Sequence, residues 1–274
     1  MELLAALKGR AFAVGEGGPR GVNAGFIKTE RGTLLVDSLV SLADGRFLVE
    51  TATAKAGPIA GLVYTHEHGD HVIGSAALVT VMGAQAAQGV EVLASEGTAA
   101  GIADFLRRSG AELAKQGISP KAPTLVFEAG ARLLWGPEVV VVDLGGHARG
   151  SSVVYVPSAK TLFAGDLVFN GTFPWIGHAD IDRWIASLTA LEAWDIETVI
   201  PGHGPVGGKD ILGGQRAYLE RMTRVIAALR ARRASLDEAR RALTEEFGLT
   251  QYPEYFFQSL TMALRETFGF EERQ

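Results

Sequence analysis

The chain has 274 residues, 47% of them hydrophobic, which is enough to bury a sizeable core in one large domain or two small ones. A formal net charge of −5 argues against a general nucleic-acid-binding surface, and the absence of cysteine excludes disulfides and thiolate metal ligands. The sequence shows neither a signal peptide nor a run of roughly 18 apolar residues that could span a membrane, so we expect a soluble cytoplasmic protein.

Strand-forming and turn-forming residues alternate in the first half of the chain. We predict strands at residues 11–14, 22–29, 33–37, 59–63 and 90–94. Helices are predicted at 42–56, where Gly57-Pro58 stops the pattern, and at 70–85. Ser95 has the character of a helix N-cap before an apolar stripe that includes Ile102, Phe105 and Leu106. Residues 117–123 carry no clear pattern and are expected to form a loop.

The same alternation continues in the second half. Further strands are predicted at residues 138–144, 152–156, 161–164 and 198–200, and a helix with one apolar face at 180–194. Strands followed by helices in both halves favour two packed sheets covered by helices, which is a layered α/β arrangement. No sequence repeat or linker separates independent domains.

The region after residue 206 has a helical pattern. An apolar stripe predicts a helix at 215–234, and Ser235-Leu236-Asp237-Glu238 has the form of a capping box before a second helix. A third helix is predicted from Tyr252-Pro253-Glu254 to about Gly269. We expect a helical extension over 207–274. This extension contains an aromatic cluster of Tyr252, Tyr255, Phe256 and Phe257. The cluster either packs in the core or is exposed, where it would line a substrate entrance or form a dimer contact.

One segment after the predicted strand at 59–63 concentrates polar residues. It contains His66, His68 and His71, three of the six histidines of the chain, together with Asp70. A loop at a strand end is a good place for metal ligands, because the strand fixes the direction of the backbone. Neutral imidazole and carboxylate together suit zinc, iron or manganese. The segment therefore predicts a metal site.

The spacing His-x-His-x-Asp-His resembles the signature of the metallo-β-lactamase-fold hydrolases. Three more motifs of that family have matches in the same order, in the segments Gly146-His147-Ala148-Arg149-Gly150-Ser151, Phe163-Ala164-Gly165-Asp166 and Pro201-Gly202-His203-Gly204-Pro205. The resemblance covers residues 37–205, most of the chain. It implies one domain over 1–274 with an αββα four-layer sandwich, metals at one edge between the sheets, and extra C-terminal helices.

The resemblance also implies a ligand set for two divalent metal ions. The ligands of the first ion would be His66, His68 and His147, those of the second Asp70, His71 and His203, with Asp166 bridging the two. Zn²⁺ is the first expectation, and Fe or Mn are the alternatives. Two cations about 3.5–4 Å apart can share one water and lower its pKa towards about 7. Asp70 is in addition the candidate catalytic residue, which would orient the nucleophile or shuttle a proton.

Several residues near the motifs are candidates for supporting roles. Asp37, at the end of the strand predicted at 33–37, is either the hydrogen-bond acceptor that fixes a ligand histidine or a simple turn former. Asn170, Trp175 and Arg149 are candidates for the substrate pocket. Arg149 could meet a substrate anion or form a structural salt bridge. His178 belongs to no motif and is interpreted as a surface or helix-start residue.

The resemblance implies a dinuclear metal-dependent hydrolase that uses a metal-bridging hydroxide on an ester, lactone, thioester or amide of a small molecule. Asp166 disfavours β-lactamase action, because family members that open β-lactams generally lack an aspartate there. Glyoxalase-II-like enzymes keep all seven ligands, but their glutathione-binding residues have no convincing match here. The alternative is an oxidoreductase that resembles the mononuclear iron persulfide dioxygenases. We expect a small-molecule substrate, no nucleic-acid or membrane partner, and lean towards a homodimer.

Overall fold

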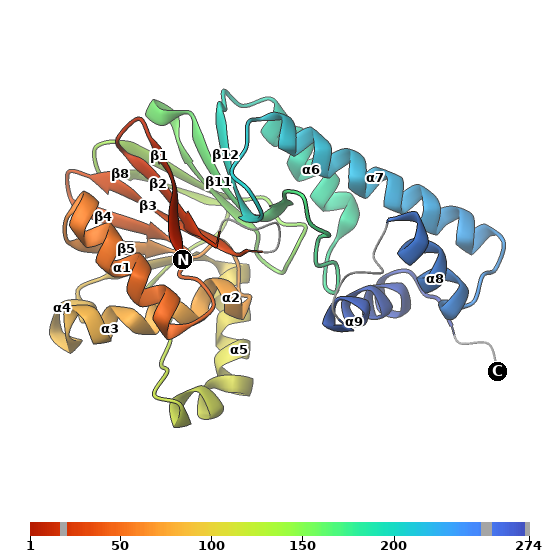
Figure 1. Ribbon diagram of the computed structural model, residues 1–274, viewed down its shortest axis with the longest axis horizontal. Helices are drawn as coiled ribbons and strands as arrows, with labels where there is room; N and C mark the ends of the chain where they lie inside the picture. Colours follow the sequence, from red (N-terminus) through yellow and green to blue (C-terminus); the bar gives the residue numbers. More distant parts are fainter. Residues whose placement is uncertain (17–20, 248–253, 272–274) are drawn as a thin grey trace.

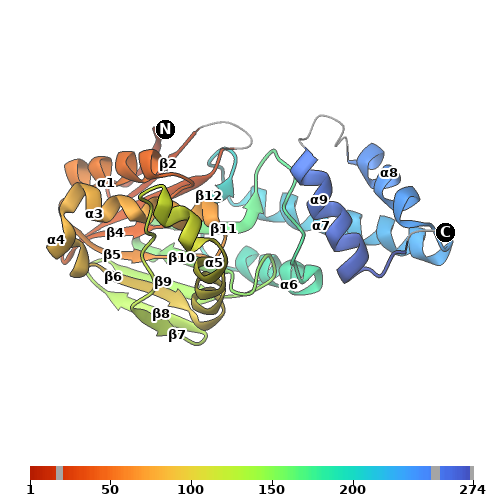
Figure 2. The same cartoon turned by 90° about the horizontal axis from the view of Figure 1, so that it is seen from below.

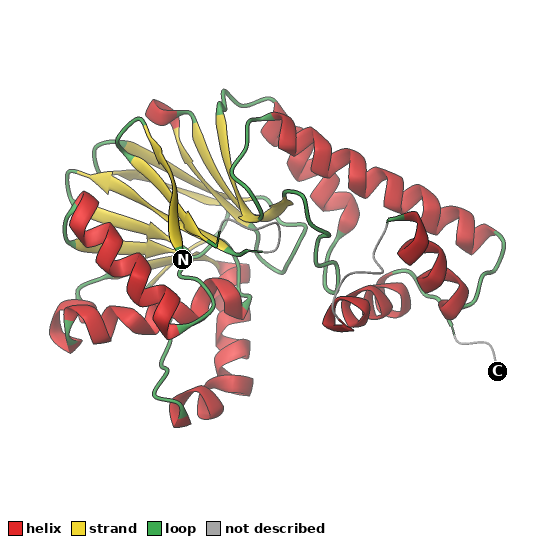
Figure 3. Cartoon of the chain, in the orientation of Figure 1, coloured by secondary structure: helices red, strands yellow, loops and turns green. Residues whose placement is uncertain are grey.

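The computed structural model of the protein describes residues 1–16, 21–247 and 254–271. Its described strands form two sheets that face each other, and helices cover the outer side of each sheet (Figure 1, Figure 2). Further helices at the C-terminal end of the chain extend beyond this sandwich (Figure 3). The predicted layered α/β arrangement, an αββα sandwich with extra C-terminal helices, is confirmed.

The larger sheet has seven strands in the order β1-β2-β3-β4-β5-β6-β7. They are β1 (Glu2–Leu7), β2 (Ala11–Gly15), β3 (Asn23–Thr29), β4 (Gly32–Val36), β5 (Ile59–Val63), β6 (Glu91–Ser95) and β7 (Leu125–Phe127). Neighbours from β1 to β4 are antiparallel, whereas those from β4 to β7 are parallel. Parallel neighbours need a crossover, and α1 (Leu42–Ala56) provides it between β4 and β5.

The smaller sheet has five strands in the order β12-β11-β10-β9-β8. They are β8 (Gly130–Leu134), β9 (Glu138–Asp143), β10 (Ser152–Val156), β11 (Thr161–Phe169) and β12 (Thr198–His203). Only the pair of β11 and β12 is parallel among its described pairs, and α6 (Ile181–Glu192) connects the two strands.

Side chains alternate between two buried layers along the strands of the larger sheet. In β4, Leu34 and Val36 point into the core between the sheets, while Leu35 packs in the cluster under the outer helices. A sheet that is covered on both faces needs such apolar residues on both sides. The whole of β4 beyond Gly32 is therefore buried.

The remaining helices cover the sheets or extend the chain. They are α2 (Gly69–Val72), the 3₁₀ turn η1 (Ile73–Ala76), α3 (Ala77–Met82), α4 (Ala84–Gln88), α5 (Glu96–Lys115), the 3₁₀ turn η2 (Pro157–Ala159), α7 (Asp210–Ala231), α8 (Leu236–Glu246), α9 (Glu254–Met262) and the π-helical turn η4 (Ala263–Thr267). Helices α1 and α5 contact the larger sheet, and α6 and α7 contact β11 of the smaller one.

The helix predicted at 70–85 is instead broken into α2, η1 and α3. The break lies where the chain packs closely against α1 and the loop before it, because a Cβ atom on Gly74 would lie 3.1 Å from Cα of Gly45 in α1 and 1.8 Å from the carbonyl oxygen of Ser38. Strand β11 is longer than predicted and runs through Asp166 to Phe169. Its ladder with β12 is irregular on both sides of Gly165, which has a φ of +50°. Strands β1, β7 and β8 were not predicted.

The helical region after β12 follows the predicted order. The capping box is confirmed, since the Ser235 hydroxyl accepts from the Glu238 amide and the Glu238 carboxylate accepts from the Ser235 amide. The predicted start of the third helix at Tyr252-Pro253 lies outside the described residues. Of the aromatic cluster, Phe257 packs against the core of the helical region. No described helix is both long and apolar enough to cross a membrane.

The crossing of α1 with η1 predicts a site that is sensitive to one added methyl group. A Cβ atom on Gly45 would lie 2.0 Å from the carbonyl oxygen of Gly74, so we expect Gly45→Ala to destabilise the protein by about 1–3 kcal/mol through overpacking. Urea unfolding of the metal-free protein measures this. Gly110→Ala in α5, where no heavy atom lies within 4 Å of the new Cβ, is the control and should be neutral or stabilising by up to about 1 kcal/mol. Equal stability of the two variants would contradict the expectation.

Candidate metal centre

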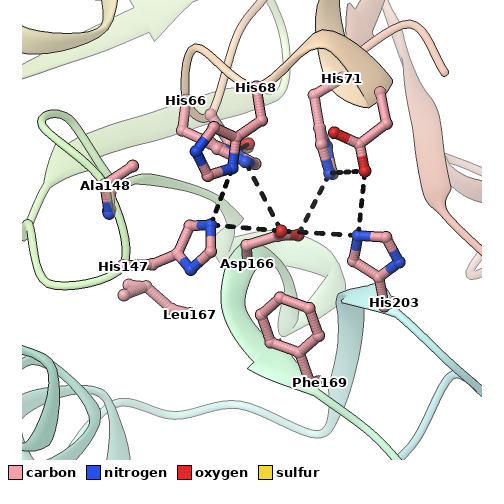
Figure 4. A network of polar contacts seen from close by, with 12 residues as sticks. His66, His68, His71, His147, Ala148, Asp166, Leu167, Phe169 and His203 are labelled. Atoms are coloured by element: carbon pink, nitrogen blue, oxygen red, sulfur yellow. Dashed lines mark hydrogen bonds and ion pairs between the residues drawn. The ribbon is translucent and has the colours of Figure 1, made fainter. Parts of the chain in front are cut away.

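The seven predicted ligand side chains lie together where strands of both sheets end (Figure 4). They fall into two groups whose ligand atoms lie within 4.8 Å of one another, one with His66, His68, His147 and Asp166 and the other with Asp70, His71 and His203. These are the two groups into which the sequence motifs divide the ligands.

Five local features of the chain place these side chains. These features are the loop after β5 (His66, His68), α2 (Asp70, His71), the turn between β9 and β10 (His147), the irregular part of β11 (Asp166) and the end of β12 (His203). Two glycines allow the close approach. Gly146 has a φ of +125° before His147, and a Cβ atom on Gly202 would lie 1.9 Å from Oδ1 of Asp166. Any larger residue at 202 would displace that carboxylate.

In the first group the ligand atoms lie at the spacing of a coordination shell. Nε2 of His147 is 3.1 Å from Nδ1 of His68 and 3.4 Å from Oδ2 of Asp166, and Nε2 of His66 is 3.6 Å from that same oxygen. Ligands that surround a tetrahedral ion at about 2.0–2.1 Å lie about 3.3–3.4 Å apart. The group therefore fits one divalent ion.

The second group shares the Asp166 carboxylate with the first. Nε2 of His71 is 3.1 Å from Oδ1 of Asp166, and Nε2 of His203 is 3.5 Å from its Oδ2. Asp70 completes the group, with its Oδ2 3.3 Å from His203 and 3.8 Å from His71. Asp166 thus faces both groups, which is the position that a bridging ligand requires.

A hydrogen-bonded network behind the ligands fixes the tautomers of two histidines. Oδ2 of Asp37 accepts from Nδ1 of His71 at 2.9 Å and from the Thr65 hydroxyl at 2.7 Å, and its Oδ1 accepts from the Thr65 amide at 2.8 Å. Because the Thr65 hydroxyl donates to Asp37, it accepts from Nδ1 of His66 at 3.0 Å. In the neutral form of both histidines, the lone pair is then on Nε2, which faces the ligand groups. The structure thus places Asp37 behind the ligands; Thr65 was not predicted.

Buried polar atoms test whether metal ions fit this site. Among the described residues, Nε2 of His66, Nε2 of His71 and Oδ1 of Asp166 are buried without a hydrogen-bond partner. A buried polar atom without a partner costs about 1–3 kcal/mol, so three in one cluster need a ligand. Nδ1 of His147 also lacks a described partner, and it does not belong to the ligand atoms. The His/Asp cluster fits divalent metal ions.

Burial keeps the first group of imidazoles neutral. It lowers the pKa of His147 to about 3 and holds the pKa values of His66 and His68 below the ordinary value. Neutral imidazole is the form that binds metal, so these three residues need no deprotonation at neutral pH.

Carboxylates dominate the second group. Burial would lower the pKa of His203, but Asp166 and Asp70 raise it to about 10, and the same carboxylates together with Asp37 hold the pKa of His71 well above its ordinary value. Burial would likewise raise the pKa of Asp166, yet the surrounding histidines hold it well below the usual range. Without a metal ion, His71 and His203 therefore carry protons.

A cleft of about 830 Å³ opens onto both ligand groups. Its lining includes the ligands His68 and Asp70, and Arg149 and Trp175 also line it. Arg149 also pairs with a carboxylate of α5. Asn170 is not among the lining residues, because its side chain donates to the carbonyl oxygen of Pro205 at 2.8 Å and holds the chain beyond β12. A role of Asn170 in the substrate pocket stays a prediction.

Other lining residues were not predicted as part of the site. His178 is exposed and lines the cleft, but it belongs to neither ligand group. Phe105 belongs to the apolar stripe predicted for its helix, yet it lines the cleft. A helical stripe identifies apolar positions but does not distinguish a core from the wall of a cleft.

Comparisons with known proteins give a consistent assignment. The family model described as the metallo-beta-lactamase superfamily matches residues 17–203, more than half of the chain. An acyl-coenzyme A thioesterase MBLAC2 of Gallus gallus is 29% identical over 107 residues, 37% of this chain and 37% of that protein. A linear primary-alkylsulfatase of Pseudomonas sp. (strain ATCC 19151) is 25% identical over 222 residues, 68% of this chain and 42% of that protein. The chain thus spans less than half the length of either relative.

Solved structures share the fold. The crystal structure of the DIM-1 metallo-beta-lactamase matches with a TM-score of 0.61 and 22% identity, over 80% of this chain and 97% of that one. At this identity the likeness concerns the fold alone.

The position of Asp37 generates a prediction about metal affinity. Asp37 has a φ of +56°, which asparagine tolerates, so Asp37→Asn removes the charge with little backbone strain. Since the amide can no longer accept from both Thr65 and His71, we expect zinc affinity to fall about 10–100-fold, as competition with a chromogenic chelator measures. Asp44→Asn in the first turn of α1 is the control and should bind zinc like the original chain. Unchanged affinity in a folded Asp37→Asn protein would contradict the role.

Protons on the second ligand group generate a prediction about pH. An ion that binds there must displace the protons that the raised pKa values keep on His71 and His203, so binding releases protons and the apparent affinity falls as the pH falls. Zinc titration calorimetry in buffers of different ionisation enthalpy counts these protons. His178→Ala, which lies outside both groups, should leave the count unchanged. A heat of binding that does not depend on the buffer would show that the second group is already deprotonated.

Proposed function

The chain belongs to the metallo-β-lactamase superfamily, and on this premise we propose that it is a metal-dependent hydrolase of small-molecule acyl esters, with thioesters as the first class. The observation that carries the proposal is the pair of ligand groups joined by Asp166 on the floor of an open cleft. A carboxylate between two nitrogen-rich groups supports a site for two ions, and this donor set suits Zn²⁺, with Fe or Mn as alternatives.

Divalent ions held in these groups would supply an activated water near neutral pH and polarise the substrate carbonyl. The chain itself contributes position and proton transfer. The Asp70 side chain is 33% exposed towards the cleft, so its carboxylate can orient a water molecule and accept its proton. Positively charged histidines hold the pKa of Asp70 well below its ordinary range despite burial, so the carboxylate is ionised in the metal-free protein. His66 and His71 are almost fully buried and close the site to solvent from behind.

Similarity to a thioesterase supports the thioester class within the broader group of ester, lactone, thioester and amide substrates. Similarity to an alkylsulfatase over a longer part of the chain supports sulfate esters as a second candidate. Both reactions need an activated water and electrophilic assistance at the bond that breaks. A direct comparison of the two substrate classes is therefore part of the test.

Metal content and turnover test the proposal together. We expect about two ions per chain in protein purified without added metal, and hydrolysis of an acyl thioester that a chelator abolishes. Asp166→Ala should lower both metal content and, by at least about 100-fold, kcat/KM, because it removes the ligand shared by both groups. Asp182→Ala, an exposed residue of α6, is the matched control.

Two outcomes would contradict the hydrolase. One is metal-loaded protein that turns over no thioester, carboxylic ester, lactone, amide or sulfate ester. The other is about one iron per chain together with oxygen uptake on a glutathione persulfide, which would favour the dioxygenase-like alternative.

A further inference from the structure

Two arginines, Arg108 and Arg149, line one wall of the cleft beside the carboxylate of Asp104. Asp104 in α5 lies 3.4 Å from Nη2 of Arg107 and 3.1 Å from Nη1 of Arg149. Arg108, the next residue of α5, is exposed and lines the cleft, and no described carboxylate lies within 4.0 Å of its guanidinium. Arg108 therefore offers the cleft a guanidinium group that pairs with no described carboxylate. We refer to Arg108 and Arg149 as the arginine cluster.

The arginine cluster rests on a fixed part of the backbone. The amide of Arg149 donates to Oε1 of Glu67 at 3.2 Å, and a Cβ atom on Gly97 of α5 would lie 2.7 Å from the carbonyl oxygen of Arg149. The loop after His147 is therefore in direct contact with α5. Glu67 and Glu16 also line the cleft, and the Glu67 carboxylate is held by the Arg149 amide on the side of the ligand loop. Guanidinium groups bind phosphate, sulfate and carboxylate oxygens through paired hydrogen bonds.

A second wall of the cleft is aromatic and comes from the end of β11 and the segment between β11 and α6. It consists of Phe169, Phe173 and Trp175, of which the first two are buried and the third is half-buried. Phe169 stacks on the ligand His203 with ring centroids 5.0 Å apart, so this wall begins at the second ligand group. We refer to these three residues as the aromatic wall.

The C-terminal helices hold the aromatic wall from behind. The amide of Phe169 donates to Oε1 of Gln215 in α7 at 3.1 Å, and the Phe173 ring meets the ring of Tyr218 edge to face at 5.8 Å. Helix α9 adds a third support, because the fully buried Ser259 hydroxyl accepts from the Ile176 amide at 3.1 Å. Figure 2 shows α7 and α9 on the side of the sandwich away from α1 and α3.

We propose that the cleft recognises an anionic amphiphile, an acyl ester or thioester whose oxyanion-bearing leaving group lies at the arginine cluster and whose apolar acyl chain lies on the aromatic wall. The inference rests on the proposed hydrolase and names its substrate class. Water adds to the acyl carbon, the bond from that carbon to sulfur or oxygen breaks, and the products are a carboxylic acid and a thiol or alcohol. Ser259 is a positioning residue that acts on the acyl chain through the wall.

Substrates that differ only in the leaving group test the arginine cluster. Octanoyl-coenzyme A carries phosphates, octanoyl-glutathione carries carboxylates, and octanoyl-N-acetylcysteamine is the neutral thioester of the same acyl group. We expect kcat/KM to be highest for an anionic thioester. The ratio of kcat/KM for the anionic thioester to kcat/KM for the neutral one should fall about tenfold or more in Arg108→Ala and Arg149→Ala. The ratio should also fall with added salt. Arg224→Ala on the exposed side of α7 is the control and should keep the original ratio.

Acyl-chain length tests the aromatic wall. Octanoyl thioesters should exceed butyryl thioesters in kcat/KM, mainly through KM, and Ser259→Ala should reduce this preference about threefold or more, because the Ile176 amide loses its buried acceptor. Thr261→Ala removes only a bond to the Phe257 carbonyl within α9 and serves as the matched control. Thermal unfolding should first show that both variants are folded. If the ratio of KM for the butyryl thioester to KM for the octanoyl thioester is then equal in the two variants, the role of Ser259 is overturned.

Binding of desulfo-coenzyme A separates this inference from the hydrolase itself. The probe lacks the thiol that could bind a metal ion, and calorimetry measures its affinity without turnover. An affinity for desulfo-coenzyme A that falls about tenfold in Arg108→Ala would support the arginine cluster, whether or not a thioester is hydrolysed. Absence of thioester hydrolysis together with this loss of affinity would contradict only the proposed function. A higher kcat/KM for octanoyl-glutathione than for octanoyl-coenzyme A would identify carboxylates, and not phosphates, as the anion that the arginine cluster binds. The inference would be overturned if thioesters are hydrolysed but the ratio of kcat/KM for the anionic thioester to kcat/KM for the neutral one is the same in both arginine variants and in the original chain.

Discussion

A single buried carboxylate, that of Asp37, joins the segments on which the metal centre depends. It follows β4, accepts from the amide and the hydroxyl of Thr65 two residues after β5, and accepts from His71 of α2. Only 2% of Asp37 is exposed, so these three donors replace the water that the carboxylate loses on folding. The adjacent Ser38 adds two bonds to the carbonyl oxygen of His71. Ligand geometry on the side of the larger sheet therefore follows from the left-handed turn at residue 37.

Most of the fold and the ligand set could be predicted from the sequence because local signals and motifs coincide. The helix at 42–56 has Ser41 as its N-cap and Gly57 at its end, and the structure gives it the same bounds. What the sequence could not show depends on contacts between distant segments. The helix predicted at 70–85 breaks where Gly74 packs against α1. Thr65 joins the site because it follows β5 and contacts Asp37, which follows the neighbouring strand β4. The short strand β7 has two exposed residues of three and carries no alternating pattern.

The ligands and the supports of the aromatic wall come from separate parts of this chain. The family match ends at His203, the last ligand, whereas the supports of the aromatic wall come from α7 and α9 beyond it. The arginine cluster comes from α5 and from a residue two positions after His147. Side chains that contact the walls can therefore vary without altering the ligands. This separation is the physical reason why the ligands are readable from motifs while the substrate is not.

The ligands come from both sheets, and this has a consequence for the order in which the protein folds. β5 and α2 belong to the half of the chain that forms the larger sheet, whereas His147, Asp166 and His203 come with the smaller one. Neither half has a complete ligand group by itself, so an ion gains its full set of bonds only after the halves have docked. Contacts between residues so far apart in sequence form late, because long loops must close first. Ions held by these ligands would therefore act as a cross-link between the two halves of the sandwich once these have docked.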